Sequence, residues 1–240
     1  MSGTTGFVLV HGGHGGGWNW DGVVPLLDAP AVAVDLPGRG GPPADGSTVT
    51  FGRCAEAALA AADAAGFDRI VAVAHSMGGL TISALADLAP ERVVHLVYVA
   101  ALVPAAGTTV YDLYFRSRGA EPPPAYEDRT VRLGGADAVR ARLFDDIDDE
   151  QFAAIYPRMV DEPQSLFDDP AVEPPASIPR TYIRCARDVP VPPPMATAFI
   201  ERLGPTTRVV DLDLGHGLIF THPADVAKVL NEALAASASS

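Results

Sequence analysis

The chain has 240 residues, of which 48% are hydrophobic and 20% are charged, and its formal net charge is −13. This length fits one α/β domain with a sizeable core. The acidic balance argues against nucleic-acid binding, because no basic patch is present to neutralise phosphates, and it disfavours anionic membrane surfaces.

The N-terminal part of the chain predicts a strand, a glycine-rich loop, a helix and a second strand. Residues 6–10 form a buried strand that runs into His11-Gly12-Gly13-His14-Gly15-Gly16-Gly17, a loop whose backbone must approach another group closely. The helix is predicted at 20–27, with Asn19 as its cap, and the second strand at 31–34. The loop lacks the lysine of a phosphate-binding loop and misses the G-x-G-x-x-G spacing of a dinucleotide site.

A serine follows the third predicted strand at a tight corner. The strand covers residues 69–74, a helix is predicted at 77–88, and Ser76 stands between them. Small residues, Ala74 and Gly78, lie two positions to either side, so the motif is A-x-S-x-G. The corner would place Ser76 above the carboxyl edge of a sheet, at a helix N-terminus that favours developing negative charge.

The rest of the chain continues the alternation of strands and helices. Further strands are predicted at 92–99, 179–185 and 208–212, and further helices at 50–65, 194–203 and 223–236. The alternation indicates an α/β fold with a mostly parallel sheet of about six strands and helices on both faces.

One long segment, residues 104–177, contains no strong apolar strand. Its prolines cluster at 122–124 and 174–175, and its helical patterns are short, at 111–115, 136–144 and 149–159. A segment that leaves the sheet and returns several helices later is an insertion, and in an enzyme it would form a cap over the active site. We expect a core of residues 1–103 and 178–240 and a helical cap at 104–177, within one domain.

A serine nucleophile needs a base, a group that orients the base, and donors for an oxyanion. His216 follows the last strand in a glycine-flanked loop, and Asp188 follows the penultimate strand, so both lie at carboxyl ends of strands. Asp211 and Asp213 are alternatives to Asp188, although an acid so near His216 in sequence reaches the imidazole less easily. The expected oxyanion donors are the backbone N–H groups of Met77 and Gly13.

The other histidines are weaker candidates. His11 is expected to bond to its own loop, His75 to point away from the catalytic face, and His95 and His222 to be structural. His14 can contact either the pocket or only its own loop. No His/Cys cluster has the spacing of a metal site, so we expect no metal and no cofactor.

These stretches resemble the α/β-hydrolase superfamily, and within it the branch of plant methylesterases, hydroxynitrile lyases and bacterial esterases of similar length. The matching stretches are residues 7–20, 74–79, 98–104, 187–190 and 215–216. The resemblance implies that Ser76, Asp188 and His216 form a triad in the usual chain order, that Gly13 and Met77 form the oxyanion hole, and that 104–177 is the cap.

Two positions separate the reaction classes of this branch. The lyases resemble one another in a threonine after the first-loop histidine and in a lysine after the catalytic histidine, which stabilises the departing cyanide. Here the residues are Gly12 and Gly217, and the sole lysine, Lys228, lies in the last helix. The absence of that cation favours an esterase.

The sequence therefore predicts a serine hydrolase that cleaves a carboxylic ester of a small, mostly apolar or aromatic substrate through an acyl-enzyme. The alternatives are a lyase or cofactor-free tailoring enzyme on the same triad, and a binding protein on the same fold. The expected substrate contacts are Gly12, His14, Tyr111, Phe115, Phe144, Phe152 and Gly217.

The sequence also gives expectations for the cellular location and the partners of the protein. The first residues lack basic side chains, which predicts no signal peptide, and the apolar runs are too short to span a bilayer. Two cysteines, Cys54 and Cys185, do not make a disulfide framework. We expect a cytoplasmic protein with a small-molecule substrate, no nucleic-acid or membrane partner, and either one copy or a homodimer.

Overall fold

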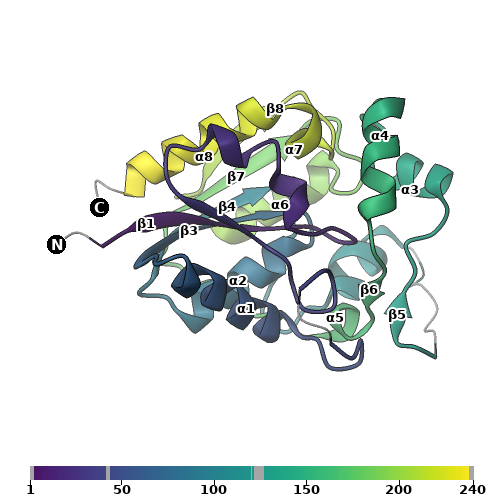
Figure 1. Cartoon of the computed structure of the whole chain (residues 1–240), viewed down its shortest axis with the longest axis horizontal. Coiled ribbons are helices and arrows are strands. Elements are labelled where there is room, and N and C mark those ends of the chain that lie inside the picture. Colours follow the sequence, from purple (N-terminus) through teal and green to yellow (C-terminus); the bar gives the residue numbers. More distant parts are fainter. Residues whose placement is uncertain (1–2, 42–43, 120, 122–126, 238–240) are drawn as a thin grey trace.

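The computed structural model describes residues 3–41, 44–119, 121 and 127–237. Its centre is a sheet of six parallel strands in the order β2-β1-β3-β4-β7-β8 (Figure 1). The strands are β1 (Thr5–Val10), β2 (Ala31–Val34), β3 (Arg69–His75), β4 (Val93–Val99), β7 (Arg180–Cys185) and β8 (Arg208–Leu212). All six coincide with the predicted strands, with ends that agree within one residue.

Successive residues of the central strands point into two hydrophobic cores, one on each face of the sheet. In β1, Val8 and Val10 belong to one buried cluster, whereas Phe7 and Leu9 belong to the other, on the opposite face of the sheet. A strand that is buried on both faces reads as a continuous apolar run, because alternate side chains point into different layers. This is why strands without an alternating pattern were recognisable.

Helices cover both faces of the sheet, as predicted. The helices α1 (Phe51–Ala64) and α2 (Gly78–Leu88) pack on one face, and α8 (Pro223–Ser237) packs on the other (Figure 1). Residues of α6 (Pro193–Leu203) join the first cluster, and α7 (Leu218–Thr221) joins the second. None of the helices in the described ranges is both long and apolar enough to cross a membrane.

The prediction of an α-helix at 20–27 is wrong. The chain instead forms two short 3-10 turns, η1 (Gly17–Trp20) and η2 (Val24–Leu26). Pro25, in the first turn of η2, supplies no N–H for an α-helical bond to the preceding turn. Asn19 does not precede the turn as a cap, but accepts the N–H of Gly16 through its side chain at 3.1 Å.

The segment 104–177 lies beyond the carboxyl ends of the strands, at the end of the molecule away from both termini (Figure 1). Its elements are η3 (Tyr111–Phe115), η4 (Arg116–Arg118), β5 (Thr130–Val131), α3 (Ala136–Leu143), α4 (Asp149–Ile155), η5 (Tyr156–Arg158), β6 (Glu162–Pro163) and α5 (Ser165–Asp168). The antiparallel pair β5–β6 was not predicted, because two residues are too few to show a period of two. The proline run 122–124 lies outside the described residues.

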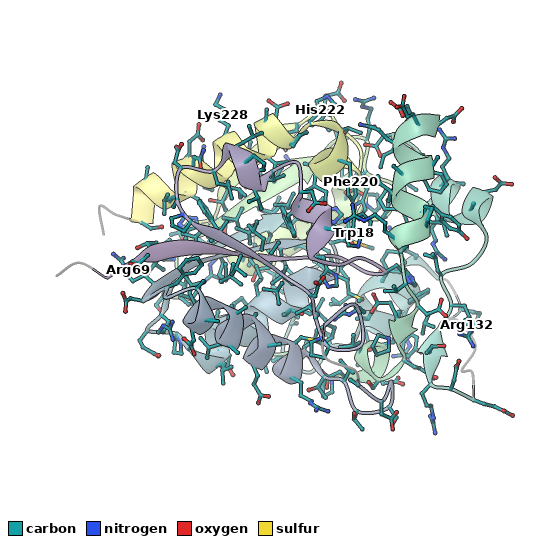
Figure 2. All side chains as sticks on the ribbon, viewed as in Figure 1. Trp18, Arg69, Arg132, Phe220, His222 and Lys228 are labelled. Carbon is teal, nitrogen blue, oxygen red and sulfur yellow. The ribbon has the colours of Figure 1, made fainter. Side chains whose placement is uncertain are left out.

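An aromatic contact joins this segment to the core. Figure 2 shows Trp18 of η1 beside Phe220 of α7, and their ring centroids lie 5.9 Å apart. Phe144, directly after α3, meets the same Phe220 ring edge-on at 5.8 Å. The contact fixes the end of α3 next to the loop that carries His216.

Candidate active site

The strand order places two loops at one crevice. β1 pairs with β2 on one side and with β3 on the other. The order in which the chain adds strands therefore changes from one side of β1 to the other at this point. In open parallel sheets, ligands bind outside the carboxyl ends of the strands at such a point. The loops that start at this edge are the glycine-rich loop after β1 and the corner that carries Ser76 after β3.

Ser76 occupies a strained corner. Its φ is +52°, in the left-handed region that side chains rarely adopt. Its N–H donates to the carbonyl of Val99 at 3.2 Å, and its carbonyl accepts the N–H of Leu102 at 3.0 Å. The chain beyond β4 therefore holds the corner from both sides.

The two glycines after the corner are required by close packing. A Cβ atom at Gly78 would lie 2.5 Å from the carbonyl oxygen of His11, and one at Gly79 would lie 2.0 Å from that of Leu102. Helix α2 can start directly behind Ser76 because these positions lack side chains. Ala74 is completely buried, so the first small position of A-x-S-x-G is also closely packed.

His216 and Asp188 form a buried pair. The Nδ1 of His216 lies 2.9 Å from Oδ2 of Asp188, and both residues are buried. The other carboxylate oxygen of Asp188 accepts the N–H of Val191 at 2.6 Å, which fixes the acid in its own loop. With Nδ1–H donating to the carboxylate, the second imidazole nitrogen of His216 is free to accept a proton.

The competing acids have other partners. Asp211 accepts from Arg184 at 2.6 Å, and Asp213 lies 3.2 Å from Arg187. Both carboxylates are on the surface, and Arg184 holds the pKa of Asp211 below its usual range. Neither is bonded to His216.

Two residues beside Ser76, Gly13 and Met77, have backbone N–H groups without an acceptor in the described ranges. Both residues line one cavity together with Ser76 and His216. A Cβ at Gly13 would lie 3.8 Å from Cε of Met77, so the two residues are neighbours. Free N–H donors suit an oxyanion, and the donor of Met77 also lies at the N-terminus of α2.

The cavity walls are mainly apolar and come largely from the segment 104–177. Four of the seven expected substrate contacts line it, namely Gly12, His14, Phe115 and Phe144. The other apolar lining residues are Leu102, Val110, Tyr114, Val131, Leu143, Phe167 and Pro190. The polar groups at the wall that the sequence did not indicate are Asn19, Arg132, Arg142 and Glu162.

Three of the expected contacts lie behind the wall. Tyr111 packs its ring against Phe115 and Phe167, with centroids 5.9 and 5.6 Å away. Phe152 packs against Phe144 and belongs to a separate buried cluster. In a short amphipathic helix, one aromatic side chain can face the cavity while the next packs against a neighbouring helix. The sequence does not distinguish these two roles.

Gly217 is the third expected contact behind the wall, and residues of the segment 104–177 cover it. Its N–H donates to Asp146 at 3.2 Å, and a Cβ there would lie 2.8 Å from the side chain of Ile147. Tyr114, by contrast, does line the cavity.

The side chain of His75, which was expected to point away from the catalytic face, contacts His216. Its ring packs against that of His216, and its Nε2 lies 3.0 Å from the carbonyl oxygen of that residue. Burial, and then the neighbouring His216, lower the pKa of His75 well below its usual value, so the ring is neutral. His11 does bond within its loop, since its Nδ1 lies 2.8 Å from the carbonyl oxygen of Gly12, and burial lowers its pKa to about 3.

A buried ion pair beside the cavity was missed. Nη1 of Arg39 lies 3.2 Å from Oε2 of Glu162, and both side chains are almost inaccessible. Glu162 is one of 30 acidic residues, and nothing in its local sequence distinguishes it. In the described ranges no group of three or more His, Cys, Asp or Glu side chains could hold a metal ion.

Comparison with known proteins identifies relatives of the chain. A sequence model described as "Alpha/beta hydrolase family" matches residues 7–229. A probable esterase from rice, Oryza sativa, is 40% identical over 108 residues, which are 42% of this chain and 40% of the rice protein. That match therefore spans less than half of the rice protein.

Other relatives align over nearly the full length. A pyrethroid hydrolase from Sphingobium wenxiniae is 26% identical over 94% of this chain and 86% of its own. The crystal structure of a pyrethroid hydrolase from Sphingobium faniae has a TM-score of 0.83 at 24% identity, covering 98% of this chain and 99% of that one. These similarities show the fold, and the named relatives are esterases and hydrolases.

Proposed function

Since the chain belongs to the alpha/beta hydrolase family, we propose that it hydrolyses carboxylic esters of small, mostly apolar or aromatic substrates through an acyl-enzyme on Ser76. The observation that carries this proposal is the buried His216–Asp188 pair, which opens onto the same cavity as the strained Ser76 corner. The esterase relatives support the same reaction class.

The first half-reaction uses each group of the site. The free nitrogen of His216 takes the proton of Ser76 as its oxygen attacks the ester carbonyl, and the N–H groups of Gly13 and Met77 receive the oxyanion. Asp188 keeps Nδ1 protonated and stabilises the imidazolium. His216 then protonates the leaving alkoxide, and the alcohol departs from the acyl-enzyme.

Water completes the cycle. His216 removes a proton from a water molecule, the hydroxide adds to the acyl carbon, and collapse of the second tetrahedral intermediate releases the acid and returns the proton to Ser76. The strained corner at Ser76 presents its oxygen to the cavity in both half-reactions.

The cavity lining supports an apolar substrate. Its largest side chains are aromatic, Tyr114, Phe115, Phe144 and Phe167. The charged groups at the wall are partly compensated within the protein, since Arg132 pairs with Asp128 and Asp161, and Glu162 pairs with Arg39. A neutral ester with an apolar acyl or alcohol group fits this lining best.

A cyanohydrin lyase is disfavoured by two positions. A Cβ at Gly12 would lie 2.9 Å from Cβ of Ser76, and a side chain at Gly217 would meet Asp146 and Ile147. Lys228 projects from the outward face of α8, far from the cap (Figure 2). No lysine is therefore placed to receive a departing cyanide.

The test is hydrolysis of p-nitrophenyl butyrate by wild type, Ser76→Ala and the surface control Ser47→Ala. We expect Ser76→Ala to lose activity by roughly 10³-fold or more, by analogy with other serine triads, and to lose labelling by a fluorophosphonate probe. Ser47 is exposed and remote, so its variant should keep both. Activity of Ser76→Ala within about tenfold of wild type would overturn the proposal, and cyanide release from cyanohydrins would favour the lyase.

A further inference from the structure

The residue after Gly13 has an unusual backbone. His14 has a φ of +60°, one of only a few non-glycine residues in the described ranges with a positive value. This conformation is unfavourable for a residue with a Cβ, and it persists only where the surroundings hold it. His14 stands among glycines, so it carries the only side chain between Gly12 and Gly17 that can anchor the loop.

Two residues of the cap, Val160 and Glu162, hold His14 by three hydrogen bonds. The N–H of His14 donates to Oε1 of Glu162, and its carbonyl accepts the N–H of Val160 at 3.1 Å. Its ring Nδ1 lies 2.9 Å from the carbonyl oxygen of Val160, which requires a proton on Nδ1. Both backbone groups and the ring of His14 are therefore bonded to one short segment of the cap.

The core in turn fixes the carboxylate of Glu162. Its side chain is fully buried, and Oε2 pairs with the buried guanidinium of Arg39 at 3.2 Å. Arg39 also donates to the sulfur of Cys54 in α1 at 3.3 Å. An unpaired buried carboxylate would be strongly unfavourable, so the pairing with Arg39 holds the Glu162 side chain in place.

The remaining anchors of the loop lie on either side of Gly13–His14. His11 bonds to the carbonyl of Gly12, and the N–H groups of Gly16 and Gly17 donate to Asn19 and Asp35. The peptide plane that carries the Gly13 N–H also carries the Gly12 carbonyl, which His11 holds, and the next peptide plane carries the His14 N–H, which Glu162 holds. The orientation of the Gly13 N–H therefore depends on anchors on both sides of Gly13. Without the bonds to His14, this glycine stretch has many accessible conformations.

We propose that Glu162 and Arg39 are positioning residues that hold His14, and through it the Gly13 N–H, in the geometry that receives the oxyanion. The inference rests on the proposed ester hydrolysis. It makes the oxyanion hole dependent on the docked cap, because Val160 and Glu162 hold the residue that follows one of its two donors.

The test compares Glu162→Ala, Glu162→Gln and the matched control Asp161→Asn on p-nitrophenyl butyrate. Glu162→Ala should lower kcat by about 10- to 100-fold with KM within about threefold, since an oxyanion donor acts in the transition state. Glu162→Gln keeps an acceptor for the His14 N–H and should recover part of kcat. Asp161 is the adjacent acid, pairs with Arg132, and should tolerate the change within about threefold.

A second measurement separates positioning from a general structural role. A trifluoromethyl ketone with a butyl chain forms a tetrahedral adduct that uses the oxyanion hole, whereas butyrate binds as a product. In Glu162→Ala, affinity for the ketone should fall in proportion to kcat/KM, and affinity for butyrate should stay within about threefold. Equal losses for the two ligands would overturn the inference.

The two proposals fail in different ways. If Ser76→Ala retains ester hydrolysis, the proposed function fails. If Ser76→Ala is inactive but both Glu162 variants keep kcat within about twofold, only the positioning role is overturned. If Glu162→Ala does not fold, Glu162→Gln and Arg39→Gln replace it in the test. The inference is contradicted if Glu162→Gln keeps the wild-type kcat and ketone affinity and Arg39→Gln also keeps the wild-type kcat.

Discussion

The imidazole of His75 packs against that of His216, with the ring centroids 4.6 Å apart and the planes tilted by 43°. Its Nε2–H donates to the carbonyl oxygen of His216 at 3.0 Å, and its side chain is buried. The residue before the serine therefore supports the residue that activates the serine. Because His75 is neutral, it adds no positive charge beside His216 when that ring takes up a proton.

Replacing His75 should impair the reaction without abolishing it. His75→Leu leaves the buried carbonyl of His216 without a donor, which costs roughly 1–3 kcal/mol. We expect a lower melting temperature and a kcat reduced by about tenfold, because His216 loses its support. His75→Gln offers an amide donor and should recover part of both. A His75→Leu enzyme with wild-type kcat and melting temperature would show that the contact has no such role.

The choice of acid can be tested by three amides. Asp188→Asn presents an N–H to Nδ1 of His216 and favours the wrong tautomer, so kcat should fall by about 10³- to 10⁴-fold, as in serine proteases. Asp211→Asn and Asp213→Asn break only surface ion pairs and should keep kcat within about twofold. Steady-state kinetics on one ester gives all three values. If Asp211→Asn or Asp213→Asn lost most of its kcat while Asp188→Asn stayed active, that residue and not Asp188 would be the acid that orients His216.

Two glycine-to-alanine changes should shift stability in opposite directions. At Gly79 a Cβ would lie 2.0 Å from the carbonyl oxygen of Leu102, so Gly79→Ala should lower the free energy of unfolding by about 3 kcal/mol or more. Gly52 lies in α1 with no atom closer than 3.7 Å to the new Cβ, so Gly52→Ala should raise it by about 0.5–1 kcal/mol. Urea unfolding measures both, and effects of the same sign would contradict the packing argument.

Acid stability should depend on His95. Burial, and then Arg208, lower the pKa of His95 to about 4, and its Nε2 lies 2.9 Å from Oγ1 of Thr181. Between pH 6.5 and 4 the unfolded chain binds a proton at this residue and the folded chain does not, so the free energy of unfolding falls as the pH falls. His95 contributes about 3 kcal/mol to the loss of stability between these two pH values.

The measurement is urea unfolding at several pH values for wild type and His95→Asn. Asparagine does not titrate, so the variant should lose less stability between pH 6.5 and 4. His11 and His75 also have lowered pKa values and keep part of the pH dependence in both proteins. Parallel curves for the two proteins would show that His95 is not the titrating group.

Local patterns were sufficient for the sheet and for the centre of the candidate site. The six strands were visible because buried parallel strands are continuous apolar runs of a few residues. The corner at Ser76 was visible because a tight strand-to-helix turn needs small neighbours, which are Ala74 and Gly78. The order of strands along the chain also placed Asp188 and His216 at the same sheet edge.

Contacts between distant residues decided the rest. Asp188 is the partner of His216 because Asp211 and Asp213 are paired with arginines, and the sequence alone left the three acids as alternatives. The choice between Tyr111 and Tyr114 for the cavity depends on how η3 packs against Phe167.

The sequence by itself determined where the chain turns and which residue types meet at the sheet edge, because those features rest on short-range sterics and the burial of apolar runs. Only the tertiary structure brought Glu162 to His14, 148 positions away, and Arg39 to Glu162. Such contacts follow from the way the segment 104–177 packs against the rest of the chain, and no local pattern encodes them.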